Sequence, residues 1–136
     1  MADSVTTLKG MNAELAGKMK ESGITNTDHL LDKAGTPAAR RELAKAVGIE
    51  PSALLELVNR ADLSRIKGIG GVFADMLEEA GVDSVKELAH RRPDNLQAKL
   101  EEVNGAKKLS TRTPNLDQCE TWVAEAKELS AKSPVE

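Results

Sequence analysis

The sequence predicts an all-α protein, a compact bundle of short helices that two tandem copies of one helical unit would form. Three observations carry this prediction. The composition favours helices, and aromatic residues make up 1%, with only Phe73 and Trp122 present, too few for a β-sandwich or a barrel. Apolar residues recur at spacings of three and four, as in Leu54, Leu57 and Val58. The third observation is an internal repeat.

The repeat is found when the chain is aligned with itself at an offset of 58 residues. Residues 8–11, LKGM, then match residues 66–69, IKGI. The same offset pairs Leu15 with Phe73, Met19 with Leu77, Gly23 with Gly81, Ile24 with Val82 and Leu30 with Leu88.

This repeat predicts a first unit over residues 1–62, a second over residues 63–132 and a disordered tail at residues 133–136. Neither unit has many long apolar side chains. We therefore expect the two units to pack against each other as one globule.

Capping residues, prolines and glycines predict where the helices of the first unit begin and end. A short helix ends near Leu8, and another runs from about Asn12 to Ser22, where Gly23 stops it. The unit continues with a brief helix that Thr27 caps and that ends near Ala34, a helix that Thr36-Pro37 opens and Gly48 ends, and a helix from Pro51 to about Arg60.

The second unit repeats this layout, which gives ten short helices in all. It has a turn at residues 63–66, a helix from Gly71 to Ala80, a brief helix at 85–89 that Ser84 caps, a helix through Leu100, and a last helix from about Asn115 to Ala131. The residues expected in the core are Leu57, Ile69, Phe73, Leu77 and Trp122.

Charge and cysteine content limit the classes of function. The net charge of -3 argues against a strongly basic nucleic-acid-binding protein. The single cysteine, Cys119, excludes an intramolecular disulfide and any multi-cysteine metal site. We expect its thiol to be buried and unreactive, with Glu120 raising its pKa. The chain has no stretch long and apolar enough to cross a membrane, and we expect a cytoplasmic protein.

Residues 63–77 carry a glycine pattern, LxxIxGIGxxxAxxL, that resembles the helix-hairpin-helix motif of DNA repair proteins, polymerases and ligases. Gly68 and Gly70 are expected to take positive φ, and Ile69 between them to pack into the core. Amides at the start of the following helix would favour a phosphate. The candidate phosphate-binding residues are Arg65, Lys67, Gly68, Ile69, Gly70 and Gly71, with Lys9, Gly10 and Asn12 at the matching turn of the first unit.

Nearly the whole chain resembles a known bacterial family. Residues 61–70 (ADLSRIKGIG), 80–89 (AGVDSVKELA) and 97–104 (QAKLEEVN) are similar to the family called domain of unknown function 4332. Its members look like tandem helix-hairpin-helix-like (SAM-like) units. The resemblance implies a fold but no activity, because the family has no established one.

The hairpin departs from the DNA-binding pattern. Gly71 and Val72 stand where binding hairpins carry Lys or Arg, and acidic residues follow on the helix. The first expected function is weak, sequence-independent binding of DNA or another nucleic acid, and the alternative is an adaptor that binds a protein through its helical surfaces. In the alternative the hairpin is purely structural.

Other patterns give weaker hypotheses. Residues 39–59 read like a helix-turn-helix, although Glu56 lies where a DNA reader would use a basic residue. His29 and His90 have no second ligand or nucleophile nearby, so we expect no metal, no cofactor, no small-molecule substrate and no enzyme activity. A secondary basic patch is expected from Arg91, Arg92, Lys107, Lys108 and Arg112.

Overall fold

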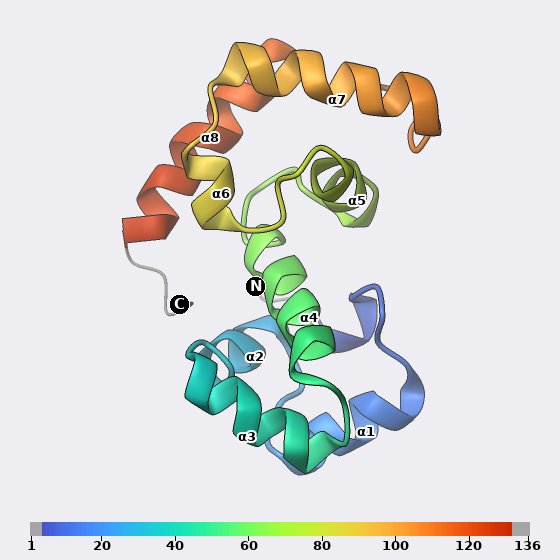
Figure 1. Cartoon of the computed structure of the whole chain (residues 1–136), viewed down its shortest axis with the longest axis vertical. Helices are drawn as coiled ribbons and strands as arrows, with labels where there is room; N and C mark the ends of the chain where they lie inside the picture. The colour runs from blue at the N-terminus through green and yellow to red at the C-terminus, as the bar shows by residue number, and fades with distance from the viewer. Residues whose placement is uncertain (1–3, 132–136) are drawn as a thin grey trace. The chain divides into compact units, whose positions relative to one another are not determined.

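The computed structural model describes residues 4–131. These residues form helices and no strand, as predicted, and Ser4 and Asn26 make one isolated β-bridge. Figure 1 shows the helices and the loops that join them. The elements are η1 (Val5–Thr7), α1 (Ala13–Glu21), α2 (Thr27–Lys33), α3 (Pro37–Val47), α4 (Pro51–Leu63), α5 (Gly71–Glu79), α6 (Val85–Ala89), α7 (Pro93–Lys107) and α8 (Leu116–Ala131).

The described chain has nine helical elements, one fewer than the ten expected. The count of ten included the turn expected at residues 63–66; the structure has turns at 64–68, after α4 ends at Leu63. The chain divides into two compact units, one that reaches to Arg65 and one that begins at Ile66. We call them unit 1, with η1 to α4, and unit 2, with α5 to α8. The tail expected at 133–136 lies outside the described residues, and the packing of both units into one globule stays a prediction.

The helix ends of unit 1 follow from side-chain capping. Asn12 Oδ1 accepts the N–H of Leu15 at 2.8 Å at the start of α1. The prediction that Thr27 caps α2 is wrong, because Asn26 Oδ1 accepts the N–H of His29 at 2.8 Å. Thr27 is instead a buried residue of the first turn. Asparagine is the better cap, so the helix begins one residue earlier than expected.

The core of unit 1 forms where α4 packs against α2 and α3. Met19, Ile24, Leu30 and Leu54 are fully buried there, and Leu57 is buried as predicted. Burial of these side chains on one face of each helix is the main stabilising term for such short helices.

In unit 2, α8 packs against α6 and α7, and α5 packs against α7. Helix α7 runs to Lys107, beyond its predicted end at Leu100, because Leu100 and the following Val103 are both buried and continue the apolar stripe. Of the predicted core residues of unit 2, Phe73 is only half-buried. Its ring contacts that of Trp122 in a tilted arrangement, with ring centroids 5.6 Å apart and an interplanar angle of 56°.

The 58-residue offset of the sequence recurs in the backbone. Helices α1 and α5 begin and end 58 residues apart, and so do the capping residues Asn26 and Ser84. Gly10 has φ +96° and Gly68 has φ +93°. The local geometry of the two glycine turns is therefore alike, while their assignment as helix-hairpin-helix modules stays a prediction.

Candidate ligand sites at the two glycine turns

The turn at residues 67–71, which we call the unit 2 turn, leads directly into α5. Gly68 takes the left-handed backbone, and Ile69 N donates to Ile66 O at 3.1 Å. The expectation that Gly70 also has positive φ is wrong, because its φ is -96°. Gly70 is the N-cap of α5, a position that requires extended backbone.

The N terminus of α5 differs from those of the other α-helices. Helices α1, α2, α3, α6 and α8 begin with a side-chain cap, and α4 and α7 begin with a proline. Within residues 4–131, α5 is the one α-helix with neither. Its first amides therefore point to solvent at the positive end of the helix dipole.

The side chains of the unit 2 turn divide into a buried anchor and an exposed rim. Ile69 is 4% exposed, as predicted. Lys67, Gly68, Gly70 and Gly71 are exposed. An anion could therefore approach the amides of this turn without displacing a side chain.

Arg65, predicted to help hold a phosphate, is bound within unit 1. Its guanidinium makes an ion pair with the carboxylate of Asp62, and its Nε donates to Asp62 O at 3.4 Å. The Asp62 side chain is 3% exposed. Arg65 therefore neutralises a buried carboxylate at the end of α4, a role that no sequence pattern indicated.

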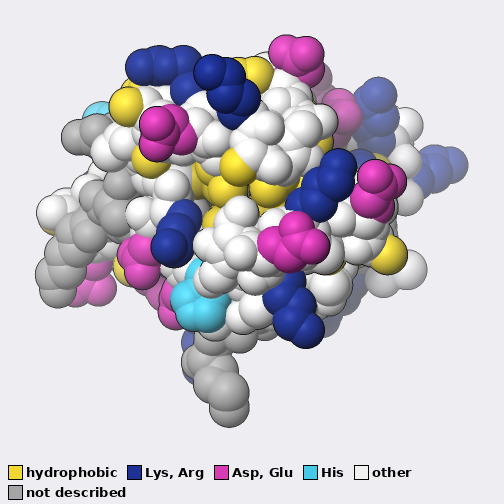
Figure 2. Space-filling model, turned by 90° about the horizontal axis from the view of Figure 1, so that it is seen from below, with side chains coloured by type: hydrophobic (Ala, Val, Ile, Leu, Met, Phe, Trp, Pro, Cys, Tyr) yellow, Lys and Arg dark blue, Asp and Glu magenta, His cyan; other side chains and the backbone are white. Residues whose placement is uncertain are grey.

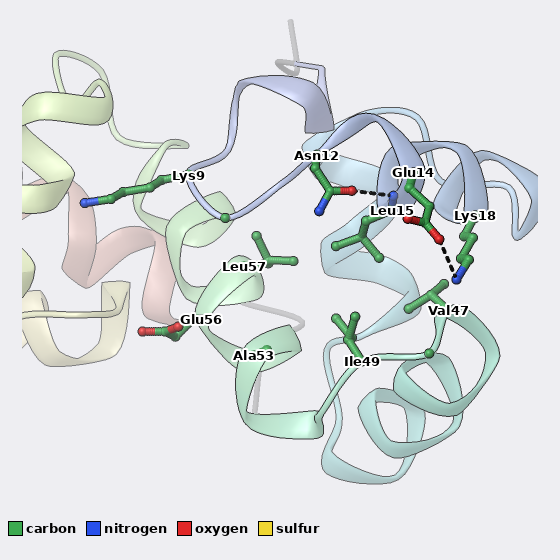
Figure 3. Close-up of a pocket in the computed structure, with 12 residues that line it drawn as sticks. Lys9, Asn12, Glu14, Leu15, Lys18, Val47, Ile49, Ala53, Glu56 and Leu57 are labelled. Carbon is green, nitrogen blue, oxygen red and sulfur yellow. Dashed lines mark hydrogen bonds and ion pairs between the residues drawn. The ribbon is translucent and has the colours of Figure 1, made fainter.

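The unit 1 turn, Lys9 to Asn12, opens onto a pocket of about 280 Å³ (Figure 3). Asn12 has φ -134°, the extended backbone of a helix N-cap, because it caps α1. Sequence reasoning missed this pocket because its lining comes from three separate stretches of the chain, residues 9–18, 47–49 and 53–57. The lining residues are Lys9, Gly10, Asn12, Glu14, Leu15, Lys18, Val47, Gly48, Ile49, Ala53, Glu56 and Leu57.

The pocket has an apolar interior and a charged rim. In Figure 3 the side chains of Leu15, Ile49 and Leu57 point toward its centre, and those of Lys9 and Glu56 extend away from it. Lys18 and Glu14 are paired at 3.6 Å on the rim. Figure 2 views the side where α1 and α3 lie in Figure 1, and it shows hydrophobic side chains at the bottom of a hollow that charged residues surround.

The secondary basic patch is largely neutralised by acidic partners. Arg91 pairs with Glu87 at 2.8 Å, Arg92 with Asp94 at 3.2 Å, and Lys107 with Glu79 at 3.9 Å. The remaining two residues, Lys108 and Arg112, are exposed.

Cys119 is fully buried, as predicted. Its burial raises the pKa of the thiol from 9.0 to about 11. The cause is desolvation of the thiolate, not the neighbouring Glu120 that the sequence had suggested.

Residues 4–131 contain no group of three or more His, Cys, Asp or Glu side chains that could hold a metal ion. In the same residues, no helix combines the length and the apolar character that crossing a membrane requires.

Comparison with known proteins gives one result. The family model of the Domain of unknown function (DUF4332) matches residues 9–129, which include both glycine turns. No curated protein and no solved structure gives a significant match.

Proposed function

The chain belongs to the family Domain of unknown function (DUF4332), and we propose that it is a non-catalytic module that binds nucleic-acid backbone weakly and without sequence preference. The binding element is the unit 2 turn. The observation that carries the proposal is the N terminus of α5, which is exposed, has no capping side chain and is preceded by glycines. Phosphate is the anion that such amides bind best in nucleic acids.

Lys67 gives this turn its positive charge. It is exposed and lies next to Gly68, where an ammonium group can reach a phosphate that the amides hold. Arg65 contributes less than the sequence suggested, because its guanidinium is committed to Asp62.

Acidic residues limit the affinity. Asp75, Glu78 and Glu79 follow on α5, and the net charge of the chain is -3. Repulsion between these carboxylates and a phosphate backbone keeps binding in the range of non-specific contacts, with Kd about 10⁻⁴ to 10⁻⁶ M. A contact with only two or three phosphates gives a log-log salt slope of about -2 to -3.

The test is fluorescence anisotropy with labelled duplex and single-stranded oligonucleotides at about 20 mM salt, where the Debye length exceeds about 20 Å. Lys67→Glu is expected to abolish measurable binding. Lys86→Glu is the matched control, because Lys86 is exposed on α6 of the same unit and the change in net charge is identical. Equal losses in the two variants, or no binding by the unmodified protein, would refute the proposal.

A protein adaptor is the second candidate function. The observation that favours it is the pocket of unit 1, whose lining includes leucine, isoleucine and valine side chains together with charged residues of both signs.

A further inference from the structure

The two glycine turns have similar backbones but different side chains beside them. In unit 2, a Cβ atom at Gly68 would lie 3.2 Å from Nε1 of Trp122. In unit 1, a Cβ atom at Gly10 would lie 3.5 Å from Cδ2 of Leu57. The unit 2 turn therefore has a hydrogen-bond donor beside it, where the unit 1 turn has a methyl group.

The indole N–H of Trp122 has no acceptor in the protein. The residue is only 2% exposed, yet its Nε1 makes no hydrogen bond within residues 4–131. The same part of the chain contains no fully buried side-chain nitrogen that lacks a partner, so Nε1 must reach solvent. Buried tryptophans usually satisfy this N–H, which can only donate. Trp122 is therefore buried except at its one polar atom, and that atom lies beside Gly68.

Unpaired backbone donors lie next to this indole. The first hydrogen bond of α5 runs from Ala74 N to Gly70 O at 2.9 Å. The amides of residues 70–73 donate to no group that the structure describes. The Trp122 ring also contacts the ring of Phe73, so the indole extends from Gly68 to the first turn of α5. Backbone donors and one side-chain donor are thus gathered at the start of this helix.

The unit 1 turn lacks both kinds of donor. The 58-residue offset pairs Gly70 with Asn12, whose Oδ1 already accepts the N–H of Leu15 at 2.8 Å. Leu57, beside Gly10, has no group that could donate. An aliphatic side chain can therefore pack beside a turn of this geometry, and packing alone does not require an indole in unit 2.

We propose that Trp122 is a ligand-binding residue of the unit 2 turn, and that its indole N–H donates to an oxygen of a phosphate group held by the amides of α5. A hydrogen bond to an anionic oxygen is stronger than one to water, so an unpaired N–H beside free amides favours an anion. Lys67 supplies charge from a flexible side chain, whereas the buried indole supplies a donor of fixed position. This role rests on the proposed binding of phosphate at the turn.

NMR titration of the full ¹⁵N-labelled chain tests this role directly. Trp122 is the single tryptophan, so its indole gives one cross-peak that needs no variant to assign. Single-stranded oligonucleotide and inorganic phosphate are added separately at low salt. With each, we expect a saturable downfield shift of the indole proton, with the same Kd as the shift of the Gly71 amide. The Gly10 amide is the internal reference and is expected to keep its position, as is the indole when sodium chloride is added at equal ionic strength.

Two variants separate the donor from the packing of the rings. Trp122→Phe keeps an aromatic side chain and removes the N–H, and it is expected to weaken oligonucleotide binding about fivefold or more. Phe73→Leu is the control, because it changes the same ring contact and leaves the indole N–H in place. This variant is expected to bind like the unmodified protein. Circular dichroism checks that both are folded, and the indole signal of the unmodified chain decides the question if one of them is not.

The outcomes separate this role from the proposed function. Oligonucleotide binding that depends on Lys67 but leaves the indole proton unshifted, or that is equal in the two variants, would overturn the role of Trp122 alone. Equal shifts at Gly10, or with sodium chloride, would overturn it as well. An indole shift with inorganic phosphate but no binding of oligonucleotide would support the role and refute the nucleic-acid function. Absence of binding to both probes would refute both.

Discussion

Gly68 and Gly70 lie two positions apart in the unit 2 turn, and their backbones adopt different conformations. Gly68 has φ +93°, and a Cβ atom there would lie 3.2 Å from the ring of Trp122. Gly70 has φ -96°, and a Cβ atom there would have nothing within 4 Å. Only the first position requires glycine for both its conformation and its surroundings.

We predict that Gly68→Ala lowers the free energy of unfolding by about 1–2 kcal/mol, because the Cβ atom of an L-residue is crowded against the backbone in the left-handed region. The close approach of Trp122 adds to the loss. Gly70→Ala is the matched control and is expected to change stability by less than about 0.5 kcal/mol. Urea unfolding of both variants measures the difference, and equal destabilisation would contradict the assignment of roles.

The Cys119 thiol makes stability depend on pH above neutrality. Its pKa is about 11 in the folded chain and 9.0 without burial, so the unfolded chain loses this proton first as pH rises. The folded state therefore loses stability between these two pKa values and is unaffected by this group below about pH 8. From about pH 8 to about pH 10 the expected loss is about 1 kcal/mol.

Cys119→Ala isolates this effect, because the variant keeps every other titrating group. The difference in unfolding free energy between the two proteins, measured from about pH 7 to about pH 10, should shrink as pH rises. A constant difference would mean that the thiol is not shielded in the folded state.

At the scale of elements, the third α-helix of each unit, α3 and α7, ends in the left-handed conformation, but the two ends use different residues. Gly48 ends α3 with φ +75°, and Lys108 ends α7 with φ +51°. Both donate their N–H to the carbonyl four residues earlier, Ala44 and Asn104. Unit 2 therefore carries conformational strain at a helix end where unit 1 has none.

We predict that Lys108→Gly raises the melting temperature. Glycine adopts the left-handed backbone without the steric cost that a side chain adds, so the free energy of unfolding should rise by up to about 1 kcal/mol. Lys107→Gly is the control, since that residue is the last of α7 and pairs with Glu79, and this change should lower stability. Thermal unfolding by circular dichroism compares them. A lower melting temperature for Lys108→Gly would show that its side chain contributes more than its backbone costs.

At the scale of the whole molecule, each unit has its own buried residues and its own set of helix contacts. The prediction that both pack as one globule rests on the small number of long apolar side chains per unit. Rotational correlation times from ¹⁵N relaxation test it directly. One common value for α1–α4 and α5–α8 is expected, and two shorter, unequal values would contradict it.

The sequence by itself determined the helix ends and turns, which depend on residues close together along the chain. Glycines, prolines and capping residues predicted most helix ends, and the 58-residue offset predicted that Gly10 and Gly68 share one turn geometry. These features follow from backbone sterics and local hydrogen bonds, which residues three or four positions apart decide.

Only the tertiary structure decided which side chains remain available for binding. Arg65 pairs with a buried carboxylate, and three of the five residues of the secondary basic patch pair with acidic residues. The pocket of unit 1 and the Phe73–Trp122 contact of unit 2 bring together helices that are distant along the chain. Such contacts depend on how side chains fill the space between helices, a property that no periodicity of the sequence encodes.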